Sequence, residues 1–80
     1  MYYVVHEPTY ALIRAESLSE AKRLYRKQVG VRAVAAMYVT EEYAKREYAI
    51  FGDSEAVDSV FRKRKSAVLL VQSDIFDWSV

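Results

Sequence analysis

The 80-residue chain contains no cysteine, one histidine, one proline and two glycines. The absence of cysteine excludes disulfide bonds and thiolate zinc sites. His6 alone cannot build a histidine-ligated metal centre, and two isolated glycines, Gly30 and Gly52, do not form a phosphate-binding loop. Stability must therefore come from apolar burial, which a composition of 52% hydrophobic residues can supply. We expect a folded domain that holds no metal and no cofactor.

Charge and hydropathy exclude further classes of protein. The formal net charge is +1, so there is no strong overall field to attract nucleic acid or an anionic membrane, although local clusters still can. No apolar stretch approaches the ~20 residues that cross a bilayer, and the N-terminus lacks the basic start and apolar run of a secretory signal. We therefore expect a cytoplasmic protein that does not bind a membrane.

The length allows one domain, which covers residues 1–80. Its clearest element is a helix over 18–29. Ser17 and Glu20 have the spacing of a capping box, in which each side chain satisfies a free backbone N–H at the helix start. Gly30 stands where a left-handed C-terminal cap is expected.

A second helix is predicted to begin after Asp53, which is a favoured N-cap residue. It carries an apolar stripe that includes Val57 and Phe61, and it ends in the basic run 62–65. Apolar runs of strand length, rich in β-branched residues and tyrosine, fill much of the remaining chain. These predicted strands cover residues 2–6, 9–15, 31–39 and 67–72.

Segment 40–51 has two interpretations. Residues 40–47 could form a short capped helix, or 40–45 could be a hairpin loop followed by a strand over 46–51. We favour the strand, because its side chains alternate and because it completes a β-α-β-β-α-β order. The predicted fold is then an α+β, ferredoxin-like βαββαβ sandwich, with two helices on one face of a four- or five-stranded antiparallel sheet.

The first residues allow two arrangements within this fold. Strand 2–6 could turn at Glu7 and Pro8 and pair with 9–15 as a hairpin. Alternatively, 2–15 is one long strand that bends at Pro8. The sequence leaves both arrangements open.

Residues 18–27 are predicted to form a helix, which is followed by Gly30 and by a strand over 31–38. Residues 51–57 have the pattern of a junction between the end of a strand and the start of a helix. In this order of elements the chain resembles the RNA-recognition-motif family over residues 9–72. The resemblance implies a βαββαβ fold and an RNA-binding sheet face. It also implies that Tyr48, at the second aromatic position of the third-strand motif, stacks a base, while Arg46 stands at the first aromatic position.

The sheet face opposite the predicted helices is the main candidate binding surface. Its tyrosines and arginines are side-chain types enriched among the anchors of protein interfaces, and they also suit base stacking and phosphate contacts. A third interpretation is that the face is buried under residues 2–3 and 75–78. The candidate partner-binding residues, with a C-terminal tryptophan added as an interface anchor, are Tyr10, Arg14, Arg32, Tyr38, Arg46, Tyr48 and Trp78.

The remaining charged groups do not suggest catalysis. The basic run 62–65 could bind phosphate, and helix 18–29 is also basic toward its end through Lys22, Arg23, Arg26 and Lys27. We favour the simpler explanation that these cations complement the dipole of a helix C-terminus. Glu41, Glu42 and Glu47 are close in sequence, but a solvated hairpin tip does not hold carboxylates in a cleft. His6 has no serine or threonine in a nucleophile motif to act on. We expect a protein that is not an enzyme.

The functional expectation is a small protein-binding module. By analogy of class, such a module could be a phage or mobile-element inhibitor of host defence, of the anti-CRISPR type, which works by occluding a surface. Its partner would be another protein or a second copy of the chain in a homodimer. The alternative is an RRM-like domain that binds single-stranded nucleic acid on an open sheet face.

Overall fold

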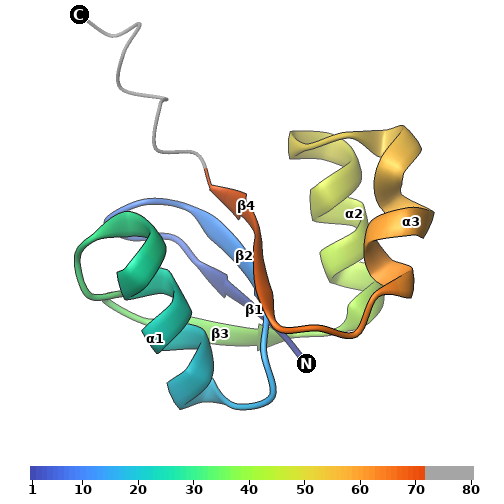
Figure 1. Ribbon diagram of the computed structural model, residues 1–80. Helices are drawn as coiled ribbons and strands as arrows, with labels where there is room; N and C mark the ends of the chain where they lie inside the picture. Colours follow the sequence, from blue (N-terminus) through green and yellow to red (C-terminus); the bar gives the residue numbers. More distant parts are fainter. Residues whose placement is uncertain (72–80) are drawn as a thin grey trace, which may run out of the picture.

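The computed structural model describes residues 1–71 of the chain, which form a four-stranded sheet with three α-helices (Figure 1). The fold is therefore α+β, as predicted. The elements in chain order are β1 (Tyr2–Val5), β2 (Ala11–Arg14), α1 (Leu18–Val29), β3 (Ala36–Val39), α2 (Glu41–Phe51), the short 3-10 helix η1 (Ser54–Ala56), α3 (Val57–Arg62) and β4 (Ala67–Val71).

The strands lie in the order β3-β1-β2-β4, and every neighbouring pair is antiparallel. Helix α1 covers one face of the sheet, while α2 and α3 lie together on the other (Figure 1). Tyr3 and Ile13 pack toward α1, and Tyr2 and Leu12 pack toward α2 and α3. Because the two central strands are apolar at nearly every position, both of their faces have to be buried.

Strand β4 contains a β-bulge that helps to bury the α2–α3 face of the sheet. Its register with β2 passes from Leu12↔Leu70 to Ile13↔Val68, so Leu69 is an extra residue opposite the partner strand. Leu69 and Leu70 both join the core on the α2–α3 side. The bulge thus lets two consecutive leucines face the same layer.

The prediction for helix 18–29 is confirmed at both ends. The Ser17 hydroxyl accepts a hydrogen bond from the Glu20 N–H at 3.1 Å. Gly30 adopts φ 94°, and its N–H donates to the Arg26 carbonyl at 2.8 Å. A residue with a Cβ rarely adopts that left-handed conformation, which explains why the helix ends at a glycine.

The second predicted helix is also confirmed, with a different first turn. The Asp53 carboxylate accepts from the Glu55 N–H at 3.0 Å and so acts as the cap. The chain then forms η1 before it continues as α3.

The prediction for segment 40–51 is wrong. These residues form helix α2, in which the Thr40 hydroxyl accepts from the Tyr43 N–H at 3.1 Å. Ala44 and Tyr48 are four residues apart, so they lie on one face of the helix, and this face packs against the core between α2, α3 and the sheet. The alternation over 46–51 is therefore part of a helical pattern. The alternative of a capped helix is confirmed, although the helix continues to Phe51.

The N-terminal alternatives are decided in favour of the hairpin. Strand β1 pairs with β2 through Tyr3↔Ile13 and its neighbours, so the single bent strand over 2–15 is wrong. Within the predicted strand 31–39, only Ala36–Val39 belongs to the sheet. The ferredoxin-like topology is not confirmed, since the observed order is β-β-α-β-α-α-β and helices cover both faces. Within residues 1–71, no helix has the length and apolar character that a membrane span requires.

Candidate functional site

The predicted tyrosine–arginine face is not a single open surface. In the described part of the chain, helices cover the central strands on both sides, and the proposed binding residues are distributed over several elements. Trp78 lies outside the described residues. The other six residues fall into a buried group, a helical group and two exposed surfaces.

Arg14 is buried, with 5% of its surface exposed, so the prediction that it projects from an open sheet face is wrong. Its guanidinium donates hydrogen bonds to the Lys65 carbonyl at 2.7 Å and to the Val60 carbonyl at 3.0 Å. Val60 lies in the last turn of α3, where carbonyls lack helical partners. Arg14 therefore caps α3 from the neighbouring sheet.

Tyr10 is half-buried, and its hydroxyl donates to the Glu47 carboxylate at 2.6 Å. Its ring lies 5.6 Å from that of Phe51 and 5.8 Å from that of His6. Burial, together with the hydrogen bond to Glu47, raises the pKa of the Tyr10 hydroxyl well above its ordinary value. The side chain links the β1–β2 hairpin to α2 and is not free to stack on a base.

Arg46 and Tyr48 lie on helix α2, so their predicted positions on a strand are wrong. The Tyr48 ring meets Phe61 edge-on, with 5.9 Å between ring centroids. Arg46 is exposed on a different side of the same helix. The base-stacking role that the RNA-recognition-motif resemblance implied for Tyr48 lacks the open sheet face that it required.

Tyr38, whose exposure the sequence left open, is exposed and belongs to an edge strand of the described sheet. Strand β3 pairs only with β1 in the described sheet. Three large apolar side chains along it are open to solvent: Val34 is 70% exposed, Met37 54% and Tyr38 63%. We call these three residues the β3 edge surface. Val34 lies just before the strand, and Met37 and Tyr38 point to opposite faces of the sheet.

Arg32 lies in a concave surface that the sequence did not predict. This cavity of about 710 Å³ is formed by α1 and the loop that follows it. Its lining contains five cationic side chains and one small apolar one. We call it the basic groove, and its residues are Lys22, Arg23, Arg26, Lys27, Arg32 and Ala33.

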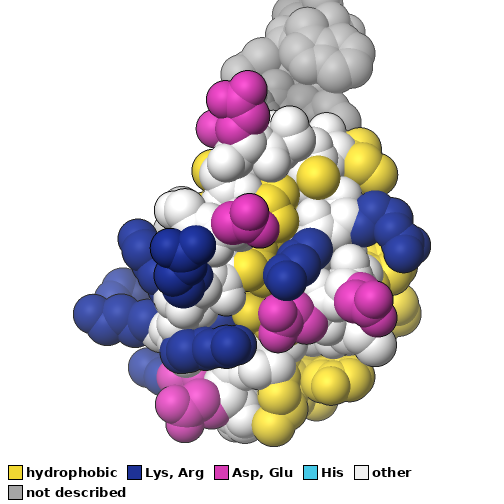
Figure 2. All heavy atoms as spheres, turned by 90° about the vertical axis from the view of Figure 1, so that its right-hand side faces the viewer, with side chains coloured by type: hydrophobic (Ala, Val, Ile, Leu, Met, Phe, Trp, Pro, Cys, Tyr) yellow, Lys and Arg dark blue, Asp and Glu magenta, His cyan; other side chains and the backbone are white. Residues whose placement is uncertain are grey.

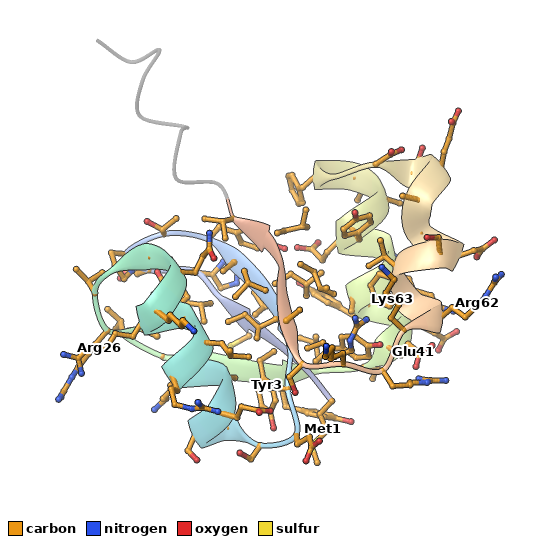
Figure 3. The ribbon with its side chains drawn as sticks, in the orientation of Figure 1. Met1, Tyr3, Arg26, Glu41, Arg62 and Lys63 are labelled. Carbon is orange, nitrogen blue, oxygen red and sulfur yellow. The ribbon has the colours of Figure 1, made fainter. Side chains whose placement is uncertain are left out.

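The basic run 62–65 is in a different environment. Figure 3 shows Arg26 pointing outward on one side of the molecule, with Arg62 and Lys63 on the other. Arg64 lies 3.7 Å from the Glu41 carboxylate. Over the α2–α3 side, positive, negative and apolar side chains intermingle (Figure 2). This run is therefore partly neutralised, whereas only cations among charged side chains line the basic groove.

The model of one protein family, the YosH C-terminal domain, matches residues 1–70. The chain belongs to the YosH C-terminal domain family. No curated protein and no solved structure matches the chain. The matched residues include every helix and three strands in full, and β4 up to Leu70. Of the resemblance to the RNA-recognition motif, only a small α+β fold is confirmed.

In this YosH C-terminal domain, Glu20 connects the start of α1 to two other segments. Its carboxylate accepts from the Glu16 N–H at 2.7 Å and from the Ser66 hydroxyl at 2.8 Å. It also lies 3.6 Å from Arg23. The hydrogen bond from Glu16 and then that from Ser66 lower the pKa of the Glu20 carboxyl, since both favour its charged form.

A smaller cavity of about 290 Å³ has a mixed lining that includes Tyr2, Arg14, Glu41 and Arg64. The Tyr2 hydroxyl is buried without a hydrogen-bond partner among the described residues. Because its lining contains charged side chains of both signs, this cavity does not favour a ligand of one charge. No group of metal-ligating side chains occurs within residues 1–71 of the domain.

Sequence reasoning noted the four cations of helix 18–29 but did not predict that they line a concave surface together with Arg32. Lys22 and Arg26, and likewise Arg23 and Lys27, are like charges four residues apart on one helix. Such pairs destabilise a helix by a few tenths of a kcal/mol each, about 0.2–0.5. This spacing of like charges was the sequence signal that could have indicated an anion-binding surface on α1. The contribution of Arg32 depends on the course of the loop after Gly30, which no pattern reveals.

Proposed function

We propose that this YosH C-terminal domain is a small protein-binding module that binds through the β3 edge surface. The observation that carries the proposal is a sheet edge that has no further partner strand among residues 1–71 and that carries exposed apolar side chains. Natural edge strands are usually shielded by charged residues, proline or a covering element. The four residues of β3 include no charge and no proline.

The other sheet edge differs in this respect. Every residue of β4 is half-buried, whereas Met37 and Tyr38 of β3 are more than half exposed. Large apolar side chains exposed on both faces of an edge strand favour a partner that adds to the strand itself. An edge strand also offers unpaired backbone groups, to which a partner strand can be added.

A second copy of the chain is the partner that this edge fits. In a two-fold antiparallel pairing, residues directly opposite one another lie on the same face. Centred on Met37, such a pairing sets Tyr38 of each copy opposite Ala36 of the other, a large side chain beside a small one. No like charges meet, because the strand has none. The two sheets then form one continuous layer.

The oligomeric state tests this proposal. We expect the mass from light scattering to rise from 9.3 kDa toward twice that value as the protein concentration increases. Met37→Lys should keep the domain monomeric at every concentration, because a charge would be buried against its own counterpart. Ile50→Lys is the matched control, since Ile50 is also largely exposed but lies on α2.

A mass that stays at the monomer value up to about 1 mM, where even weak interfaces associate, would contradict the proposal. Equal loss of association in both lysine variants would contradict it as well. The narrower expectation of an anti-CRISPR-type inhibitor of host defence stays a prediction.

A further inference from the structure

The basic groove concentrates positive charge in a domain that is almost neutral overall. We propose that this groove binds the phosphate backbone of a nucleic acid. The proposal concerns α1 and the α1–β3 loop, and it is independent of the β3 edge surface and of any sheet-face recognition. Bringing cations together in a concavity focuses the field and attracts anions locally, even when the net charge is small.

The groove has spare positive charge. Among the described residues, Glu20 pairs with Arg23 at 3.6 Å, and no ion pair is found for the other four cations of the groove. Arg26 and Arg32 are both exposed, so their guanidinium groups can turn toward a ligand. A bound polyanion would relieve the repulsion between like charges along the helix.

The geometry favours repeated phosphates. The pairs Lys22–Arg26 and Arg23–Lys27 each span about 6 Å along the helix axis. A nucleic-acid strand presents a phosphate about every 3.4 Å of duplex axis, so each row can meet more than one. Arginine guanidinium groups also match phosphate oxygens in bidentate pairs.

The lining favours a sugar–phosphate backbone over an acidic peptide. Among residues 1–71, Ala33 is the only apolar side chain that lines the groove, so these residues form no pocket there for the apolar anchors of a peptide. The part of the chain that the structure describes places no aromatic side chain in this lining, so we expect no base stacking there. Binding is therefore expected to follow the backbone and to be independent of base sequence.

The test is fluorescence anisotropy of labelled oligonucleotides with the whole chain. Three probes, oligo(dT), oligo(U) and a DNA duplex, identify which source of phosphate fits best. If all five cations engage phosphates, log affinity should fall with log salt with a slope of about −3.5 for single strands or about −4.5 for the duplex. Arg26→Ala and Arg32→Ala should each reduce that slope by about 1.

Arg62→Ala and Lys63→Ala are the matched controls, because they remove the same charge on the opposite side of the molecule (Figure 3). Both should leave the affinity within about twofold, as expected for a charge outside the contact. The proposal is overturned if none of the three probes binds at low salt. It is also overturned if the control variants weaken binding as much as the groove variants, or if polyglutamate binds as tightly as the oligonucleotides.

Discussion

Arg14 shows how one side chain can reverse its expected role. An arginine on a strand is expected to be a surface cation. Arg14, however, follows three buried apolar residues and faces the α2–α3 side of the sheet, where it is paired in register with Tyr2. Its charge is offset by the carbonyls of Val60 and Lys65. A guanidinium spreads its charge over five donors, which makes burial with backbone acceptors tolerable.

At this scale we expect Arg14→Ala to lower the free energy of unfolding by about 2–4 kcal/mol, because two part-buried carbonyls lose their donor and a cavity opens. Urea denaturation followed by circular dichroism measures the change. Arg46→Ala, on the exposed side of α2, should stay within about 0.5 kcal/mol of the parent. Similar losses in the two variants would mean that Arg14 is not held by α3 and the segment between α3 and β4.

At the scale of elements, α2 is the segment whose type the sequence did not decide. Its N-terminus is closed by Thr40 and carries Glu41 and Glu42 in the first turn, where the helix dipole favours acids. At its other end Gly52 allows a close approach, since a Cβ there would lie 2.8 Å from a Leu70 methyl carbon and 2.9 Å from the Tyr48 carbonyl. Both ends of α2 are thus specified.

Loss of the α2 cap gives a prediction that distinguishes a helix from a hairpin loop. Thr40→Ala should destabilise the domain by about 1 kcal/mol, because the Tyr43 N–H loses its acceptor. Thr40→Ser, which keeps the hydroxyl, should restore most of this. The measurement is the midpoint of thermal or urea unfolding. No difference between alanine and serine at this position would argue against the capped helix.

For the whole molecule, the β-layer is enclosed between α1 and the α2–α3 pair, and Glu20 links the start of α1 to the residue before β4. Its carboxylate joins the loop before α1 to Ser66, which directly precedes β4. Since β4 pairs with β2, this contact links the helix layer to the edge of the sheet. Its strength depends on the carboxylate staying charged.

The global stability should therefore depend on pH through Glu20. Because folding lowers the pKa of Glu20, the unfolded chain binds the proton at higher pH, and the stabilisation is present at neutral pH. It should be lost as the pH falls from the ordinary value of 4.5 through the lowered one. In urea titrations, the difference between the parent and Glu20→Gln should be largest at neutral pH and shrink in acid. Exposed Glu55 provides the control Glu55→Gln, and an equal pH dependence in that variant would contradict the assignment.

Local sequence signals were sufficient to predict a helix where the segment contains its own capping residues. Ser17, Glu20 and Gly30 delimit α1, and Asp53 begins the turn that leads into α3. The predicted binding face failed for a different reason. It assumed that 46–51 is a strand, and it assigned all helices to one side of the sheet, so that Tyr10 and Tyr48 were placed in the open when they pack inward.

The sequence alone determined that this domain is α+β, free of cysteine, and built on α1, the turn after Asp53 and apolar strands, because caps and periodicity act between residues close in the chain. Tertiary structure decided that α2 is a helix, that Arg14 is buried, and that Arg32 joins the cations of α1. These outcomes depend on which face of the sheet each helix covers. That choice is made by burial of apolar surface summed over distant segments, which no local pattern records.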